Sequence, residues 1–343
     1  MLTSNSSLIR WGIIGCGNVT EVKSGPGFRK AQGSQLVAVM RRNSAAAHDY
    51  AHRHGVPRAY DDADALISDA EVDAVYVATP PSSHHDHTLR ALAAGKPVYV
   101  EKPMACSYAD CVSMNDAAAL ASVPLFVAYY RRTLPRFIAI RKALFEGAIG
   151  TPRTVTVAYA NPPDPKLSTG DLPWRYNPEI AGGGLFADMG SHVLDLLDYL
   201  LGPIAEVRGF AVNQLNAYEA EDAVTFAMRF RDGVIGAARF AFTSQESVDQ
   251  VEIAGSNGLI RYSTFGEAPF EISTSSGTKF MKIPHPEHVQ QPMIQSIVNQ
   301  LRNEGSCPST GESAARTNLV MDQALSEYRR LPYDPPCPST SNC

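Results

Sequence analysis

The stretch GIIGCGNVT, residues 12–20, decides how the first part of this chain is expected to fold. It contains the end of an apolar run, IRWGIIG (9–15), followed at once by a second glycine, Gly17. Glycines after a strand permit a tight turn and let backbone N–H groups approach a pyrophosphate at a helix N-terminus. Thr20 replaces the third glycine of the GxGxxG pattern, so the motif is incomplete. Its place at the head of a strand–helix series favours a dinucleotide site at Gly15 and Gly17 over an ordinary strand–turn–helix.

Residues 9 to 130 alternate between strand-like and helix-like segments. Apolar runs such as LVAVM (36–40) and VDAVYVA (72–78) are separated by alanine-rich stretches such as SAAAHDYAHRHG (44–55). Continuous apolar strands that alternate with helices indicate a parallel sheet covered on both faces. The sequence therefore predicts an α/β fold, a Rossmann NAD(P)-binding domain over residues 1–128.

The pattern of strand-like and helix-like segments changes after about residue 150. Segments such as TPRTVTVAYA (151–160) have antiparallel, hairpin-type spacing, and FRDGVIG (230–236) supplies an Asp-Gly turn. One helix, in LFADMGSHVLDLLDYLLG (185–202), is expected to end at Gly202. We predict an α+β domain with an open, largely antiparallel sheet over 129–330 and a disordered tail over 331–343. A single sheet with few helices leaves one apolar face uncovered, which favours a homodimer or homotetramer.

Composition excludes several classes of protein. The net charge of −5 and the pI near 6.0 argue against nucleic acid, which favours a basic face. No apolar run approaches the roughly 18 residues of a membrane span, and the start MLTSNSSLIR lacks the layout of a signal peptide. The six cysteines include no CxxC pair and are expected to be reduced. We expect a cytoplasmic protein without a membrane or nucleic-acid partner.

Two arginines end the second predicted strand, in VAVMRRN (37–43). An NAD enzyme usually has an acid here to bond the ribose 2′-hydroxyl. A guanidinium instead offers a planar fork of donors to the oxygens of a 2′-phosphate. Unless Arg41 and Arg42 are simply solvated, they favour NADP, with NAD the less expected cofactor.

The segment VATPPSSHHDH (77–87) follows the next strand. Thr79, Pro80 and Pro81 form a stiff turn at a strand's carboxyl end, where open α/β sheets bind ligands. His84, His85 and His87 lie close together, but no further ligands support a metal site, so none is predicted. The turn is expected to contribute to a cofactor loop.

Two further segments carry candidate chemistry. In VYVEKPMA (98–105), Lys102 stands at a strand's carboxyl end with its direction fixed by Pro103, and Glu101 is placed to orient it. Asp188 and His192 are four residues apart on a predicted helix and should share one face. Oxidation of a secondary alcohol needs a hydride acceptor and a base, and histidine suits the base near neutral pH. The glycines of AGGG (181–184) leave the backbone bare for close approach by another group.

The chain resembles the Gfo/Idh/MocA family of NAD(P)-dependent oxidoreductases, which includes glucose–fructose oxidoreductases and inositol dehydrogenases. The resemblance implies a Rossmann domain, a C-terminal open sheet that mediates oligomers, and a sugar or polyol substrate. The segments that carry it are, in order, GCGNV (15–19), ATPPSSHHDHTLRALAAGKPVYVEKPMA (78–105), YYRR (129–132), GGGLFADMGSHVLDLLDYLLG (182–202) and CPSTGESAARTNLVMD (307–322).

The resemblance implies roles position by position. Lys102 matches the lysine of the family's EKP motif, and Asp188 and His192 match its catalytic pair. Arg131, Trp174 and Arg175 fall on substrate-side segments, although the last two also suit a structural role. Thr20 departs from the small residue of the family and is expected to alter cofactor seating slightly. The residues assigned to the cofactor are Gly15, Gly17, Asn18, Val19, Arg41, Arg42, Thr79, Pro80, Pro81, His84, Glu101 and Lys102.

These features together predict an NADP(H)-preferring oxidoreductase that interconverts a secondary hydroxyl and a ketone on a sugar, a polyol or a related cyclic compound. One alternative is an enzyme that holds and recycles its cofactor, oxidising and then re-reducing a sugar ring, which permits glycoside cleavage or sugar–sugar oxidoreduction. Another is a non-catalytic NADP(H)-binding sensor, which would not need the lysine and histidine that this chain keeps.

Overall fold

The computed structural model describes residues 8–168 and 172–330, which divide into two compact units. The first unit contains the described residues up to Lys142 together with Lys282–Asn318, and the second contains Ala143–Met281 and the residues from Leu319 on. The first boundary falls after Lys142, whereas the predicted one lies between residues 128 and 129, and a late segment of the chain also returns to the first unit. The predicted disordered tail, 331–343, lies outside the described residues.

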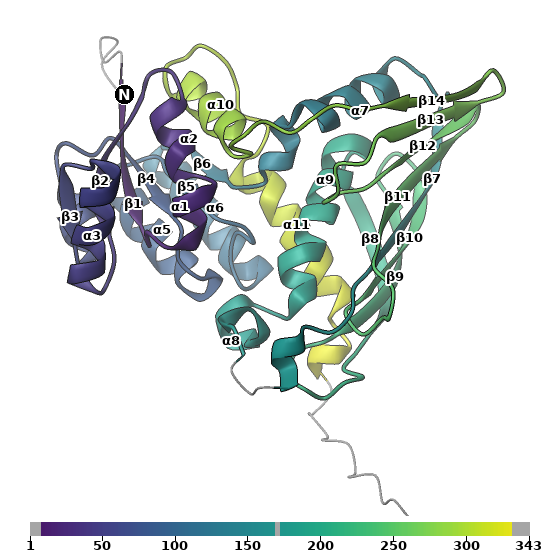
Figure 1. Cartoon of the computed structure of the whole chain (residues 1–343), viewed down its shortest axis with the longest axis horizontal. Helices are drawn as coiled ribbons and strands as arrows, with labels where there is room; N and C mark the ends of the chain where they lie inside the picture. The colour runs from purple at the N-terminus through teal and green to yellow at the C-terminus, as the bar shows by residue number, and fades with distance from the viewer. Residues whose placement is uncertain (1–7, 169–171, 331–343) are drawn as a thin grey trace, which may run out of the picture. The chain divides into compact units, whose positions relative to one another are not determined.

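The first unit is built on a parallel sheet (Figure 1). Its strands, as far as the structure describes the chain, follow the order β3-β2-β1-β4-β5-β6, which is the doubly wound Rossmann order. Every neighbouring pair is parallel. The strands are β1 (Ile9–Ile14), β2 (Ser34–Met40), β3 (Arg58–Tyr60), β4 (Ala74–Val77), β5 (Val98–Val100) and β6 (Leu125–Val127).

Helices cover both faces of this sheet. They are α1 (Asn18–Val22), α2 (Gly25–Lys30), α3 (Ser44–His54), α4 (Ala63–Ser68), α5 (His84–Ala93), α6 (Tyr108–Ala121) and α10 (Gln291–Leu301), with short turns η1 (Pro81–Ser83) and η2 (Tyr130–Thr133). Two neighbours on β1 show the two-sided packing, because successive side chains of a strand point to opposite faces. Trp11 stacks against Phe28 of α2 with ring centroids 4.9 Å apart. A Cβ on Gly12 would lie 2.7 Å from Leu66 of α4, so this helix packs directly on the backbone.

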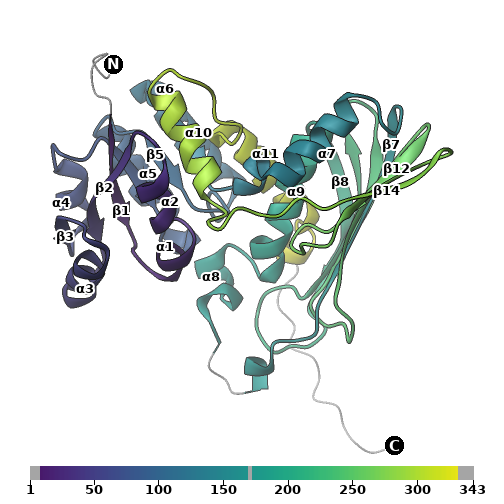
Figure 2. The same cartoon turned by 45° about the horizontal axis from the view of Figure 1, so that its top comes forward.

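The second unit is built on a mixed, mostly antiparallel sheet (Figure 2). Its strand order in the described residues is β14-β13-β12-β11-β7-β10-β9-β8, in which only the pair β7 and β10 is parallel. The Asp-Gly turn predicted at FRDGVIG connects β9 and β10, and Gly233 takes a φ of +89° there. The strands are β7 (Pro152–Ala160), β8 (Ile204–Val212), β9 (Ala223–Phe230), β10 (Ile235–Ala241), β11 (Val248–Gly255), β12 (Gly258–Tyr262), β13 (Phe270–Thr274) and β14 (Gly277–Met281).

One face of this second sheet packs against a helical segment, and the other does not. Phe186 packs edge-to-face against Phe240 of β10, with the ring centroids 5.0 Å apart. Buried and exposed residues alternate along β9, as expected for a strand with one face covered. The helical elements of the unit are η3 (Pro165–Ser168), η4 (Trp174–Tyr176), α8 (Pro178–Ala181), the π-helix η5 (Phe186–Gly190), α9 (Ser191–Leu201) and η6 (Tyr328–Arg330). Helices α7 (Pro135–Phe145) and α11 (Gly311–Ala324) contain unit boundaries. The predicted combination of a Rossmann domain and a largely antiparallel open sheet is confirmed.

Candidate active site

The glycine-rich turn after β1 is shaped for a group outside the protein. Gly15 has a φ of +92°, and a Cβ there would lie 2.8 Å from Thr79 Cγ2, so no side chain fits. A Cβ on Gly17, in contrast, would meet only Gly15 O, at 3.9 Å. The space beside Gly17 is therefore open at the point where Asn18 and Val19 begin α1. Exposed backbone N–H groups in such a turn suit a pyrophosphate.

Thr20 takes the place of the motif's third glycine without opening the fold. Its side chain is fully buried, and its hydroxyl donates to Gly17 O at 2.8 Å. The Tyr50 hydroxyl donates to Thr20 O at 3.0 Å, where the helix is interrupted between α1 and α2. A Cβ on Gly25 would lie only 2.1 Å from Thr20 O. The close backbone contact that requires a glycine thus falls at Gly25, five residues later than the motif places it.

The two arginines at the end of β2 are exposed side chains. Arg41 N donates to Tyr60 O at 3.1 Å, which anchors its backbone to β3. No hydrogen bond or ion pair of either guanidinium group appears among the residues that the structure describes. Their donors are consequently available to an anion at the edge where a parallel sheet binds nucleotides.

His84 joins two candidate segments. The ring is fully buried, with Nε2 2.7 Å from Thr79 O and Nδ1 3.0 Å from Pro103 O. Burial lowers the pKa of His84, opposed by the same carbonyl groups. A neutral imidazole carries one N–H, and we assign it to Nε2 because that contact is the shorter. Through this ring the Thr79–Pro80–Pro81 turn and the turn after β5 are held together.

The EKP segment directly follows β5. Glu101 N donates to Val77 O at 2.8 Å, the last bond of that strand pair, and the peptide between Lys102 and Pro103 is cis. The Glu101 carboxylate is buried and accepts from Tyr76 Oη at 2.5 Å, from Gln290 Nε2 at 2.8 Å and from the backbone N of Lys102 at 3.2 Å. Glu101 therefore holds the main chain of Lys102.

Arg131 lies in η2, after β6, with its side chain buried. Its guanidinium stacks on the Tyr130 ring at 5.0 Å from the centroid, and Nη1 donates to the Tyr130 hydroxyl at 3.1 Å. A cation stacked on an aromatic ring is fixed in direction. Arg131 is accordingly a rigid group in the first unit.

Asp188 and His192 lie in the second unit at the junction of two helical forms. Asp188 belongs to the π-helix Phe186–Gly190, and His192 is the second residue of α9. The sequence pattern predicted one continuous α-helix, whereas the structure has a π-helical turn at its start. Such turns are frequent at functional sites. His192 is buried, with its ring 6.0 Å from the Phe265 ring in an edge-on arrangement. The helix ends at Gly202, as predicted.

The glycines before Asp188 are approached closely by Glu221 of the same chain. Gly184 N donates to Glu221 Oε1 at 3.0 Å, and a Cβ on Gly184 would lie 2.7 Å from Glu221 O. Burial raises the pKa of Glu221. Nearby, Trp174 and Arg175 form η4 with Tyr176, whose hydroxyl donates to Asp164 at 3.3 Å. Trp174 is 44% exposed, which suits contact with a ligand better than a core position.

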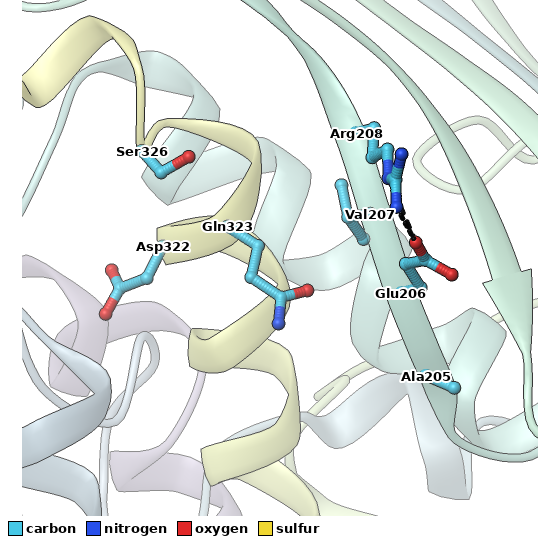
Figure 3. Close-up of a pocket in the computed structure, with 7 residues that line it drawn as sticks. All are labelled: Ala205, Glu206, Val207, Arg208, Asp322, Gln323 and Ser326. Atoms are coloured by element: carbon cyan, nitrogen blue, oxygen red, sulfur yellow. Dashed lines mark hydrogen bonds and ion pairs between the residues drawn. The ribbon is translucent and has the colours of Figure 1, made fainter.

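A separate surface pocket in the second unit contains none of the predicted site residues (Figure 3). Its volume is about 430 Å³, and a Glu206–Arg208 ion pair lies on its β8 side. The residues that line it are Ala205, Glu206, Val207, Arg208, Asp322, Gln323 and Ser326.

Within the described parts of the chain, no group of three or more His, Cys, Asp or Glu side chains is arranged to hold a metal ion. No helix of that same part is long and apolar enough to cross a membrane.

Sequence reasoning missed the side chains that support the predicted ones. Tyr76, Tyr99, Gln290 and Glu221 are all buried and polar. Tyr76 and Tyr99 alternate with valines inside strands, so they read as core residues, and Gln290 lies 189 positions from its partner Glu101. One signal was present in the sequence. Glu101 stands at the end of an apolar strand, and a buried carboxylate needs hydrogen-bond partners, so such partners could have been expected.

Comparison with known proteins identifies the family of this chain. Residues 9–129 match the model of an oxidoreductase family with an NAD-binding Rossmann fold, and residues 137–261 match the GFO/IDH/MocA C-terminal domain. The chain belongs to the Gfo/Idh/MocA family. This membership makes it an oxidoreductase with an NAD(P)-binding domain, and the open space beside Gly17 fits such a cofactor.

Several Gfo/Idh/MocA proteins are similar over most of their length. Oxidoreductase P35 of Formosa agariphila is 38% identical over 317 residues, which are 92% of this chain and 98% of that protein. The 1,5-anhydro-D-fructose reductase of Ensifer adhaerens is 29% identical over 88% of this chain and 91% of its own. The crystal structure of an aldose–aldose oxidoreductase from Caulobacter crescentus, complexed with glycerol, superposes with a TM-score of 0.83 at 26% identity, covering 94% and 98% of the two chains.

Proposed function

We propose that this protein is an NADP(H)-preferring oxidoreductase that interconverts a secondary hydroxyl and a ketone on a sugar, a polyol or a related cyclic compound. The observation that carries the proposal is Lys102, held at the carboxyl end of β5 in a family whose named relatives reduce or oxidise sugars. The substrate class follows from relatives such as the 1,5-anhydro-D-fructose reductase and a D-apiose dehydrogenase from Paraburkholderia graminis.

The reaction requires three functions from the protein's own residues. A bound nicotinamide cofactor supplies or accepts the hydride. Lys102 holds the reacting oxygen and stabilises the negative charge that develops on it. His192 gives or takes the proton, since an imidazole exchanges protons near neutral pH. Asp188 positions the substrate.

Substrate contacts are assigned to Arg131, Trp174 and Arg175. Arg131 offers fixed donors to hydroxyl oxygens because it is stacked on Tyr130. Trp174 offers an exposed ring face, which suits the apolar face of a sugar ring.

The preference for NADP rests on Arg41 and Arg42. Both follow β2 directly, at the position where NAD enzymes carry an acid, and both are exposed. A 2′-phosphate would accept hydrogen bonds from donors that have no partner among the described residues. The cofactor residues are completed by Gly15, Gly17, Asn18, Val19, the Thr79–Pro81 turn, His84 and Glu101.

A substrate panel tests the proposed reaction. Purified protein is incubated with sugars, polyols and their keto forms, each with NADP(H) and with NAD(H), and absorbance at 340 nm is followed. We expect turnover with at least one sugar or polyol and a higher kcat/KM with NADP(H). Absence of turnover with every compound and both cofactors would overturn the proposal.

A second candidate is favoured by the similarity to the aldose–aldose oxidoreductase. In this candidate function the protein would keep its cofactor, oxidise one sugar and then re-reduce a sugar with the same hydride. The absorbance spectrum of the freshly purified protein distinguishes the two: a retained cofactor absorbs before any addition, whereas an exchangeable one does not.

The uncovered face of the second sheet supports a homodimer or homotetramer. Phe210 on β8 and Ile235 on β10 are 70% and 55% exposed. Isolated exposed apolar residues are common, but these two lie on the same face of one sheet, on the strands that flank β9. We propose that a second copy of the chain covers this face.

A further inference from the structure

Four buried side chains form one hydrogen-bonded cluster behind the end of β5. They are Tyr76 on β4, Tyr99 on β5, Glu101 and Gln290, the residue before α10. The Tyr99 hydroxyl donates to Gln290 Oε1 at 3.1 Å, and Gln290 Nε2 donates to Glu101 Oε1 at 2.8 Å. Tyr76 donates to the same carboxylate oxygen at 2.5 Å. The two tyrosine rings are stacked, with their centroids 4.8 Å apart.

The two oxygens of Glu101 divide between this cluster and the main chain. Oε1 takes both side-chain donors, and Oε2 accepts the backbone N–H of Lys102 at 3.2 Å. Any rotation of the carboxylate would therefore shift the Lys102 peptide. The residue after Lys102 is a proline, which has no N–H to contribute a further ladder bond.

We propose that Gln290 is a positioning residue for the hydride-transfer reaction, acting through Glu101 on Lys102; the proposal rests on the function assigned to Lys102 above. Its role is to fix the plane of the Glu101 carboxylate, so that the Lys102 main chain, and with it the start of the side chain, keeps one direction.

An amide is suited to this position because it carries a donor and an acceptor on one planar group. Its N–H₂ faces the carboxylate and its oxygen faces the Tyr99 hydroxyl, which fixes the amide orientation from the hydrogen bonds alone. Leucine would remove the acceptor of the buried Tyr99 hydroxyl and one of the two side-chain donors to Glu101. A carboxyl group would donate to Glu101 only while it is protonated, because two ionised carboxylates at this distance repel.

The experiment compares Gln290→Leu and Gln290→Glu with a control on α10, the helix that follows Gln290. The control is Gln295→Leu, since the Gln295 amide also makes hydrogen bonds, accepting from Gln32 N at 2.7 Å, but makes none to Glu101 among the described residues. Measured quantities are kcat and KM across pH, the Kd of the cofactor and the thermal midpoint. We expect Gln290→Leu to lower kcat by about 10- to 100-fold, the cost of misplacing a reacting group, with a smaller change in cofactor Kd.

Gln290→Glu provides a readout that loss of folding cannot imitate. Its kcat relative to the wild type should be highest at low pH and should decline as the pH rises and the introduced carboxyl ionises, whereas the ratio for Gln290→Leu should stay flat. If Gln290→Leu does not fold, Tyr99→Phe removes the donor to the same amide and should lower kcat in the same direction.

Lys102→Ala is measured in parallel to separate two failures. A wild-type rate in Lys102→Ala overturns the role of Lys102 and the role of Gln290 with it. A low rate in Lys102→Ala, together with wild-type kcat and pH dependence in both Gln290 variants, overturns the positioning role alone. An equal loss of kcat in Gln295→Leu also overturns it, because the effect would then belong to the helix.

Discussion

Replacement of His84 tests how the turn after β4 and the turn after β5 are joined. His84→Leu retains most of the buried volume but removes the only ring that touches both Thr79 O and Pro103 O among the contacts described above. One N–H donor is lost, which leaves a buried carbonyl oxygen unpaired at a cost of about 1–3 kcal/mol. His84→Gln places an amide N–H near the former Nε2 and should restore about half of that loss.

The pH dependence of stability gives an independent measure. Burial lowers the pKa of His84, so below about pH 6.5, the value of a free histidine, the unfolded chain binds a proton that the folded protein does not. Stability then falls as the pH falls, by up to about 1.4 kcal/mol per pH unit from this group, until the pH reaches the lowered pKa. Both His84 variants remove this contribution, so their stability should depend less on pH between about 6.5 and 5.

The assay is urea unfolding followed by the fluorescence of Trp11. Trp11 is fully buried in the first unit, and the other tryptophan, Trp174, is removed by Trp174→Phe in every sample. His85→Leu is the matched control, because the described residues give His85 one solvent-exposed hydrogen bond, to Ser113 Oγ at 3.1 Å, and it should change stability by less than about 0.5 kcal/mol. Equal stability of His84→Leu and the wild type, or an unchanged pH slope, would refute the assignment of a buried neutral donor.

Three further predictions concern cofactor, catalysis and assembly. Arg41→Asp should weaken NADP(H) binding by about 1.5–3 kcal/mol, and equal wild-type affinity for NAD and NADP, measured by titration, would contradict the preference. His192→Ala should lower turnover by roughly 10²–10⁴ with little change in cofactor affinity, whereas Lys102→Ala should lower both; more than about half the wild-type rate in His192→Ala would contradict proton transfer by this residue. Phe210→Lys with Ile235→Lys should dissociate the oligomer in light scattering, and a wild-type monomer of 37.1 kDa would contradict assembly through the sheet.

The sequence predicted the parts of the fold that depend on local pattern. The parallel sheet of the first unit follows from apolar runs alternating with helices, and the Asp-Gly turn and the end of α9 at Gly202 follow from the conformations that glycine alone adopts readily. The return of residues 282–318 to the first unit was not predicted, because α10 has the same amphipathic pattern whichever sheet it covers.

The chemically distinctive residues of the candidate site could be predicted from the sequence, but the residues that hold them in place could not. Lys102 and His192 stand out because charged or titratable groups next to apolar runs need an explanation. The π turn at Asp188 was not predictable, since its spacing is also that of an α-helix. The close approach expected at the AGGG glycines is confirmed at Gly184, but the approaching turn at residues 220–221 was not predicted, because it is distant in sequence.

The segment around Lys102 shows why its supports are buried side chains and not sheet hydrogen bonds. Glu101 N makes the last bond of the β4–β5 pair, and Pro103 has no N–H to donate to the sheet. Glu101 is held from one side by Tyr76 and Gln290, and Pro103 O lies against His84 on the other. A lysine whose main chain is held in this way leaves the sheet in one direction. Substitutions of these supports should consequently alter kcat more than they alter the affinity for substrate, because they change where Lys102 points and leave the remaining binding groups in place.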